Sequence, residues 1–226
     1  MNIIISGASK GIGKELAIQA AQNGHSVLAL ARNKELLQSL EAKNDFITAI
    51  SLDLISDDCS KTISQWVDNN GRIDVLINNA GQLINKPFLE TSTSDFKGQF
   101  EANVVSAINL IQAVAPFFMG KAHIVNITSM GGFQGSSKYP GLSAYSASKG
   151  ALSVLTECLA EEFKQKGVSV NALALGAVQT EMLENAFPGY EAPVSPAQMA
   201  TYILEFACSG HKFYNGQILP VALGNP

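Results

Sequence analysis

The stretch that decides the fold is the first seventeen residues, Met1-Asn-Ile-Ile-Ile-Ser6-Gly7-Ala-Ser9-Lys10-Gly11-Ile12-Gly13-Lys-Glu-Leu-Ala17. Its run of three isoleucines is short and β-branched, which is typical of a buried parallel strand. Glycines follow directly, and a helical pattern then runs to the helix stop at Asn23-Gly24. A strand, a glycine turn and a helix N-terminus together form a phosphate site from backbone N–H groups and the helix dipole. The alternative is an ordinary turn that needs glycine for a positive φ.

Beyond this unit, apolar runs typical of strands alternate with helical patterns. We expect further strands at 27–30, 46–52, 73–77, 124–128, 168–175 and 217–221, and helices at 34–41, 57–68, 93–118, 144–166 and 196–209. Such alternation predicts a parallel sheet with helices on both faces. The expected fold class is therefore α/β, a Rossmann-type doubly wound sheet of about seven mostly parallel strands. Ligands of such sheets bind at the carboxyl ends of the strands.

Length and composition predict one domain over residues 1–226, with no linker or low-complexity stretch. A net charge of -4 argues against nucleic acid or an anionic membrane as the main partner. The cysteines Cys59, Cys158 and Cys208 lack metal-ligand spacing and are typical of a reducing cytosol. No targeting peptide fits before the first strand, and we expect no apolar run long enough to cross a bilayer. The sequence thus predicts a soluble, cytoplasmic protein.

Tyr145 and Lys149 stand four residues apart in a predicted helix, and Ser129 lies sixteen residues before Tyr145. Residues at i and i+4 share one helix face. An ammonium beneath a phenol favours the phenolate, so we expect the pKa of Tyr145 to fall from its ordinary value of about 10. Such a phenol can give a proton to a carbonyl or take one from an alcohol. Taken alone, this spacing is common, and chance surface placement is the alternative.

The glycine spacing Gly7-x-x-x-Gly11-x-Gly13, together with Tyr145 and Lys149, resembles the short-chain dehydrogenase/reductase family in its compact single-domain branch. The resemblance extends from the first strand to about residue 224. Its motifs, in the family's order, are Ser6-Gly7-x-x-x-Gly11-Ile12-Gly13, Asn78-Asn79-Ala80-Gly81, Asn103, Ser129, Tyr145-x-x-x-Lys149 and Gly176-Ala-Val178-x-Thr180. The family implies an oxidoreductase that moves a hydride between nicotinamide C4 and a small-molecule carbonyl or secondary alcohol.

Two other functions compete with this one. A catalytically silent NADP(H)-binding sensor would keep the fold, but it has no need of the intact acid–base set. A sugar-nucleotide epimerase or dehydratase of the extended branch has a different glycine spacing and a larger substrate domain than this chain can hold. The family itself does not identify a substrate.

The resemblance also implies which residues contact the cofactor. Asp53 would meet the adenine amino group, Val178 the nicotinamide amide and Thr180 a phosphate. The full implied set is Gly7, Ser9, Lys10, Gly11, Ile12, Gly13, Arg32, Asp53, Leu54, Asn79, Ala80, Gly81, Tyr145, Lys149, Gly176, Val178 and Thr180. One departure is Leu175 before Gly176, where the family usually has proline, and this change loosens a rigid turn.

The end of the second predicted strand favours NADP(H) over NAD(H). NAD enzymes usually place a carboxylate there to bind the ribose hydroxyls, whereas an arginine suits a 2′-phosphate. This chain has no acid at that position but has Arg32, and Lys10 in the glycine loop adds a second positive charge. The alternative is that both side chains are ordinary solvent-exposed cations.

By resemblance, Tyr145 is the general acid in reduction and the base in oxidation. Lys149 lowers its pKa and holds the nicotinamide ribose, while Ser129 donates a hydrogen bond to the substrate carbonyl. Asn103 corresponds to the family asparagine that holds a water connecting the lysine to solvent. Thr128 is the rival of Ser129, because neighbouring strand residues point to opposite faces and only one can serve.

Two segments are expected to shape the substrate side. The gap between Ser129 and Tyr145 is longer than usual, and the surplus falls in residues 135–141. Residues 182–196 stand where the family carries a short substrate lid, and no basic cluster there marks a phosphorylated substrate. The two long predicted helices at 93–118 and 144–166 carry surplus apolar residues, so we expect a homodimer or homotetramer.

Overall fold

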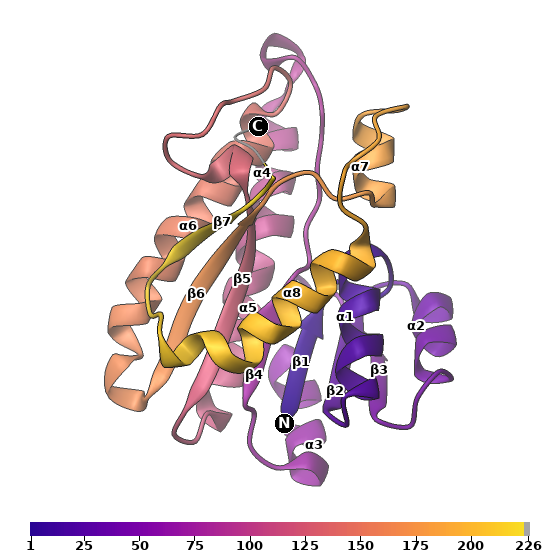
Figure 1. Cartoon of the computed structure of the whole chain (residues 1–226), viewed down its shortest axis with the longest axis vertical. Helices are drawn as coiled ribbons and strands as arrows, with labels where there is room; N and C mark the ends of the chain where they lie inside the picture. Colours follow the sequence, from indigo (N-terminus) through magenta and orange to yellow (C-terminus); the bar gives the residue numbers. More distant parts are fainter. Residues whose placement is uncertain (224–226) are drawn as a thin grey trace.

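The computed structural model describes residues 1–223 and contains a seven-stranded sheet in the order β3-β2-β1-β4-β5-β6-β7 (Figure 1). Every neighbouring pair is parallel, so the predicted doubly wound sheet is confirmed and is wholly parallel over these residues. The chain reverses its direction of travel across the sheet between β1 and β4, which creates a switch point where ligands bind. The strands are β1 (Asn2–Ser6), β2 (Ser26–Ala31), β3 (Ile47–Ser51), β4 (Val75–Asn78), β5 (Ala122–Ser129), β6 (Val168–Leu175) and β7 (Ile218–Val221).

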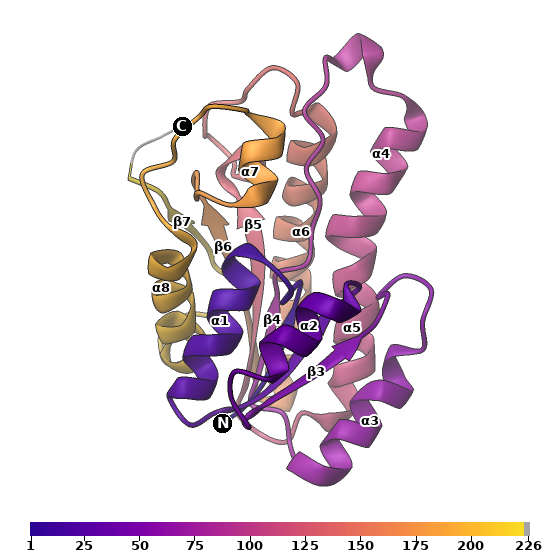
Figure 2. The ribbon, with the colours of Figure 1, turned by 90° about the vertical axis from the view of Figure 1, so that its right-hand side faces the viewer.

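Helices cover both faces of the sheet (Figures 1 and 2). One face carries α1, α2 and α8, the other carries α3 to α6, and α7 lies beyond the carboxyl ends of the strands. The helices are α1 (Gly11–Gln22), α2 (Lys34–Glu41), α3 (Cys59–Asn70), α4 (Thr93–Phe100), α5 (Ser106–Val114), α6 (Ser143–Glu162), α7 (Glu181–Ala186) and α8 (Pro196–Ser209).

The three isoleucines of β1 fill two cores. Ile3 and Ile5 pack with α1 and α8, whereas Ile4 packs on the opposite face with α3 and α5. Successive strand side chains point to opposite faces, so a strand that is covered on both sides must be apolar at every position. Each of these fully buried side chains contributes about 1.5–3 kcal/mol relative to an exposed one.

The first turn of α1 differs from those of most other helices. The side chains of Asn33, Asp58, Ser92, Thr180 and Ser195 cap α2, α3, α4, α7 and α8. By contrast, Lys10 at the N-cap of α1 provides no side-chain cap. The N–H groups of this turn are therefore not satisfied by a capping side chain, and they point toward the switch point of the sheet.

Several predicted bounds changed in the structure. Strand 168–175 and helices 34–41 and 196–209 are confirmed at both ends. The predicted helix 93–118 is instead α4, a π-helical segment at Glu101–Val105, α5 and a 3₁₀ turn. The third strand ends at Ser51, so Asp53 lies two residues beyond it. Helix α7 was not predicted, because six residues are too few for a helical period to be recognised.

The long helical stretch Thr93–Phe117 corrects one expectation. It is long and apolar enough to cross a membrane by length and composition alone, although we expected no such run. In the fold this stretch lies against α3 and α6 and buries the polar side chains of Gln99 and Asn103. Its mean hydropathy is high because it contributes apolar residues, among them Ala, Val and Ile, to the helix layer that covers one face of the sheet.

Candidate active site

Ser129 and Tyr145 meet at the carboxyl end of β5. Ser129 is the last residue of β5, and Tyr145 is the third residue of α6. The Ser129 hydroxyl is close enough to the Tyr145 phenol to favour its ionised form. Ser129 Oγ also accepts the N–H of Gly131 at 3.1 Å. Thr128 points the other way and donates its hydroxyl to the carbonyl of Leu173 at 3.3 Å. Of the two candidates, Ser129 is therefore the one beside Tyr145.

Glycines allow this approach of β5 to α6. A 3₁₀ turn at Met130–Gly132 follows β5 and packs directly on the first turns of α6. A Cβ on Gly132 would lie 2.5 Å from the nitrogen of Gly150, and one on Gly131 would lie 2.8 Å from Ser146 Oγ. Gly132 must be glycine because the backbone of α6 leaves no room for a methyl group, whereas at Gly131 the Ser146 hydroxyl would have to turn away.

Lys149 lies one helical turn after Tyr145 and is 4% exposed. Its Nζ donates a hydrogen bond to the carbonyl of Ile127 at 2.8 Å and lies 5.9 Å from the centre of the Tyr145 ring. Burial disfavours the charged form and lowers the pKa of Lys149 to about 8. The lysine is thus mostly cationic at neutral pH and becomes neutral in mildly alkaline solution.

The pKa of Tyr145 differs from the sequence prediction. Burial raises it above its ordinary value, and the nearby Ser129 hydroxyl only partly opposes this effect. The predicted fall in the pKa of Tyr145 was wrong for the protein without cofactor. The prediction considered the nearby ammonium and ignored the desolvation of the phenolate. The Lys149 ammonium makes its hydrogen bond to the Ile127 carbonyl, so it does not neutralise the phenolate by direct contact.

Asn103 ties the loop after β4 to α6. It is fully buried in the π-helical segment, where its Oδ1 accepts the N–H of Gln82 at 2.7 Å. Its Nδ2 donates to the carbonyl of Gln82 at 3.0 Å and to Ser148 Oγ at 2.9 Å. Ser148 in turn donates to the carbonyl of Tyr145 at 2.7 Å. Sequence reasoning missed Gln82 and Ser148, and only the position of Ser148 directly before Lys149 could have indicated it.

The glycine loop between β1 and α1 is closely packed. Gly7 and Gly11 have φ values of 68° and 51°, which favour glycine. A Cβ on Gly7 would lie 2.8 Å from Ala80 Cα, and one on Gly13 would collide with the carbonyl oxygen of Gly7. The loop therefore leaves a backbone-lined cradle at the start of α1, as a phosphate site requires.

Ser6 and Asn79 join the ends of β1 and β4 beside this loop. Ser6 Oγ accepts the N–H groups of Asn79 at 3.1 Å and Ala80 at 3.0 Å. Asn79 Nδ2 donates to the carbonyls of Ser6 and Gly7 at 3.1 and 3.3 Å. No sequence pattern indicated a structural role for Ser6, because its hydrogen-bond partners lie more than seventy residues away along the chain.

Arg32 and Lys10 lie exposed at the same end of the sheet. The glycine loop reaches the end of β2 through a hydrogen bond from the N–H of Ala8 to the carbonyl of Leu30, 3.1 Å. Neither cation forms a salt bridge within residues 1–223. Asp53, after β3, accepts the N–H of Ile55 at 3.0 Å. Asp53, which was implied for the adenine, is half-buried, and its neighbour Leu54 in the implied cofactor set is buried.

The segment after β6 completes the rim of the site. Gly176 donates its N–H to the carbonyl of Val221 at 2.9 Å, and a Cβ there would lie 2.7 Å from that of Ala222. Val178 is buried and bridged to Val194, and Thr180 caps α7 by accepting the N–H of Leu183 at 3.2 Å. The three residues implied here thus follow one another from the end of β6 toward α7.

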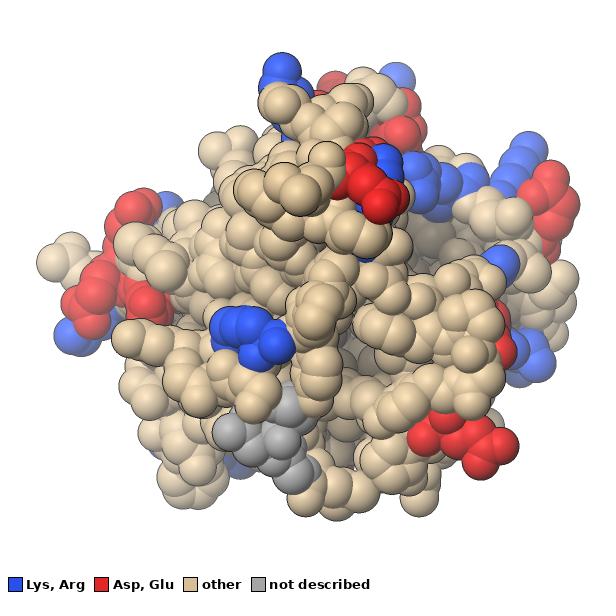
Figure 3. Space-filling model, turned by 90° about the horizontal axis from the view of Figure 1, so that it is seen from above, with Lys and Arg blue, Asp and Glu red and all other residues tan. Residues whose placement is uncertain are grey.

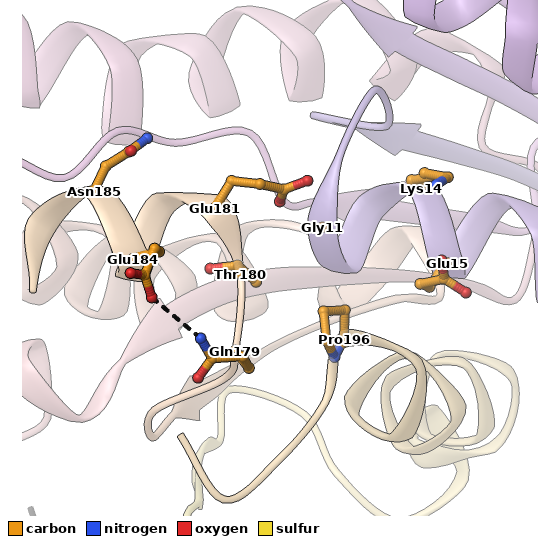
Figure 4. Close-up of a pocket in the computed structure, with 9 residues that line it drawn as sticks. All are labelled: Gly11, Lys14, Glu15, Gln179, Thr180, Glu181, Glu184, Asn185 and Pro196. Atoms are coloured by element: carbon orange, nitrogen blue, oxygen red, sulfur yellow. Dashed lines mark hydrogen bonds between the residues drawn. The ribbon is translucent and has the colours of Figure 1, made fainter. Parts of the chain in front are cut away.

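A cavity of about 460 Å³ lies between the first turn of α1 and α7 (Figure 4). Residues with polar side chains predominate in its lining, which includes Gly11, Thr180 and Glu181. The Glu181 side chain extends toward the Gly11 turn, whereas Glu184 points toward Gln179 (Figure 4). The cavity lies beside the glycine loop, and Tyr145 is not among the residues that line it.

The end of the molecule that carries these loops is mostly uncharged. Seen from this side, Lys, Arg, Asp and Glu side chains are sparse over the centre and gather toward the edge (Figure 3). On this face the charged side chains are therefore scattered and do not form one continuous patch.

A glycine loop at the switch point of a parallel sheet, with Ser129, Tyr145 and Lys149 at the end of β5, is the arrangement expected of a dinucleotide-dependent oxidoreductase. The family model described as short chain dehydrogenase matches residues 1–191. The chain belongs to the short-chain dehydrogenase/reductase family and is an oxidoreductase acting on a carbonyl or alcohol group.

Relatives of known sequence and structure agree with this assignment. The chain is 31% identical to an NADPH-dependent pterin aldehyde reductase of Arabidopsis thaliana, over 89% of this chain and 87% of that protein. It is 29% identical to the 3-oxoacyl-[acyl-carrier-protein] reductase FabG of Thermotoga maritima, over 96% and 94% of the two chains. Among solved structures, ElxO with NADP bound has a TM-score of 0.85 at 27% identity, covering 98% of this chain and 96% of that one.

Proposed function

We propose that this protein is an NADP(H)-dependent carbonyl reductase or alcohol dehydrogenase in which Tyr145 transfers the proton. The observation that carries the proposal is that Ser129 at the end of β5 and Tyr145 in the first turn of α6 lie together, with the buried cation of Lys149 one helical turn after Tyr145. A general acid, a hydrogen-bond donor and a fixed positive charge meet there at the carboxyl end of a parallel strand.

The residues around the glycine loop suit a dinucleotide. The cradle formed by Gly7, Gly11 and Gly13 offers backbone N–H groups where no side chain caps α1. Gly81 keeps the chain close to the catalytic side chains, since a Cβ there would lie 2.8 Å from Asn103 Oδ1 and 3.3 Å from Lys149 Nζ. We infer that these residues, with the others implied by the family motifs, hold the cofactor.

The preference for NADP(H) rests on Arg32 and Lys10. Both are exposed cations without a salt-bridge partner in residues 1–223, and the glycine loop that carries Lys10 is hydrogen-bonded to the end of β2 beside Arg32. Arginine binds phosphate through two parallel hydrogen bonds, which suits a ribose 2′-phosphate. The relative described as NADPH-dependent and the NADP-bound structure support the same preference.

The proton chemistry follows from the environments of the side chains. Burial keeps Tyr145 protonated at neutral pH, which is the state that a general acid needs in reduction. Ser129 orients the carbonyl oxygen, and the Lys149 cation stabilises the charge left on Tyr145 after its proton has moved. The bound nicotinamide supplies or accepts the hydride.

Three wider features belong to the same proposal. The chain forms one domain over residues 1–226, and residues 182–196 act as a short lid over the substrate. Two copies pair through the outer faces of α4, α5 and α6, where Val154 is 59% exposed. A monomeric mass at micromolar concentration would contradict the pairing.

The proposal is tested by following NADPH and NADH oxidation in parallel with ketones, aldehydes, quinones and keto-esters. The blank is Tyr145→Phe, which keeps the ring and removes the proton. We expect turnover that prefers NADPH and falls by about 10²–10⁴-fold in the blank. Tight NADPH binding without turnover on any carbonyl would instead favour a cofactor-binding sensor.

A further inference from the structure

Residues 178–194, here called the flap, form a self-contained unit at the end of β6. Its base is closed by the Val178–Val194 bridge and a hydrogen bond from the N–H of Gln179 to the carbonyl of Val194 at 2.8 Å. Within the flap, Gln179 Oε1 accepts the N–H of Ala192 at 2.6 Å. A unit with its own internal bonds and a narrow base can move as one body.

One side chain joins the flap to the opposite side of the site. Asn85, in the loop after β4, donates from its Nδ2 to the carbonyl of Ala186, the last residue of α7, at 2.9 Å. Within residues 1–223, this is the one hydrogen bond between the flap and a residue outside it. The flap therefore depends on Asn85 for its polar attachment across the site.

Asn85 is itself held against the segment that leads into α6. The N–H of Lys86 donates to the carbonyl of Gly141 at 2.9 Å. Gly141 has a φ of 84°, and a Cβ at this position would collide with Asn85 Oδ1. Because Gly141 lies four residues before Tyr145, Asn85 connects the flap to the start of the helix that carries the proton donor.

We infer that Asn85 is a positioning residue that latches the flap over the substrate side of Tyr145. The loops after β4, β5 and β6 surround the carboxyl ends of these strands. Asn85 joins the first to the third through the carbonyl of Ala186, and the neighbouring Lys86 joins the first to the second through the carbonyl of Gly141. With the latch closed, the flap shields the reacting carbonyl from water and holds the substrate against Ser129 and Tyr145. This inference rests on the proposed function for the identity of the reaction.

The first test measures the flap without cofactor or substrate. Hydrogen–deuterium exchange of residues 181–191 is compared in the wild type, Asn85→Ala and Asn85→Asp. Aspartate keeps the size of the side chain but cannot donate to the Ala186 carbonyl. The loss of one hydrogen bond should speed exchange about two- to tenfold in both variants. Asn69→Ala is the matched control, because it removes a similar bond from Nδ2 to the carbonyl of Gln65, 3.1 Å, on distant α3.

The second test measures the reaction. We expect KM for a carbonyl substrate to rise about two- to tenfold in both Asn85 variants, while kcat is unchanged or higher and the Kd of NADPH stays within about twofold. Unchanged flap exchange, or unchanged KM in an active enzyme, overturns the inference about Asn85 and leaves the proposed function standing. A wild-type chain without carbonyl turnover refutes the proposed function and with it the role of Asn85 in that reaction.

Discussion

His123 should make the protein less stable in mild acid. It lies in β5 with 1% exposure, beside the rings of Phe206 at 5.4 Å and His211 at 5.7 Å. Its Nδ1 is 2.9 Å from the carbonyl of Ala207 and must carry the proton. Its Nε2 lies 3.0 Å from Asn171 Nδ2 and accepts from it.

The Asn171 amide cannot turn round to accommodate a second proton on His123. Its Oδ1 already accepts the N–H of Gln217 at 3.0 Å, and its Nδ2 also donates to the carbonyl of Tyr214 at 3.0 Å. Burial, with a smaller contribution from neighbouring His211, lowers the pKa of His123 from 6.5 to about 4. The folded protein therefore resists protonation at this ring.

The sign and size of the effect follow from proton linkage. The unfolded chain binds a proton at His123 below about pH 6.5, whereas the native state binds it only near pH 4, so stability is lost as the pH falls between these values. These two pKa values give a loss of about 2 kcal/mol in the free energy of unfolding between about pH 7.5 and about pH 5.

The assay is urea unfolding followed by circular dichroism at both pH values, in the wild type and in His123→Asn. Asparagine retains a donor for the Ala207 carbonyl but does not titrate, so the variant should lose about 2 kcal/mol less than the wild type over this range. Equal losses in the two proteins would refute the reasoning. NMR titration of the wild-type ring gives an independent check, since the imidazole should stay neutral at about pH 5.

Three other predictions concern the site. Arg32→Ala should raise the Kd of NADPH about tenfold and leave that of NADH unchanged, measured by calorimetry; equal weakening of both would contradict a 2′-phosphate contact. Gly81→Ala places a methyl group 2.8 Å from Asn103 Oδ1 and should destabilise the protein by about 1–3 kcal/mol in urea, whereas Gly98→Ala, which meets nothing within 4 Å, should not destabilise it. Because the pKa of Lys149 in the protein without cofactor is about 8, kcat/KM for NADPH should fall as the pH rises through that value, and a flat profile up to about pH 9.5 would contradict a role for the charge.

The parts of the fold that the sequence predicted are those set by local patterns. The buried strand of isoleucines, the glycine turn and α1 follow one another directly, so periodicity and turn chemistry were sufficient to place them. The helical pattern at Lys34–Glu41 was placed correctly at both ends, and in the structure Asn33 caps its first turn. The resemblance then brought the candidate site residues to one end of the sheet, where the structure also places them.

The remainder depends on contacts between distant segments. Whether Lys149 meets the phenol or the Ile127 carbonyl is decided by packing against β5, and the pKa of Tyr145 depends on desolvation that no spacing reveals. Likewise, Asn85 has no motif of its own, and its contact with Ala186 spans 101 residues of chain. These contacts can be identified only once the order of the strands in the sheet is known.

The π-helical segment at Glu101–Val105 has a consequence for how this site could have arisen. A π turn accommodates one residue more than an α-helical turn, so it can be produced by inserting a single residue into a continuous helix. Such an insertion rotates the preceding helix relative to the following one by about 100°, the angle of one residue. Here it brings Asn103 inward to Gln82 and Ser148 while α5 still packs its apolar face in the core. Deleting one residue from this segment would restore a plain helix and withdraw the asparagine from both partners.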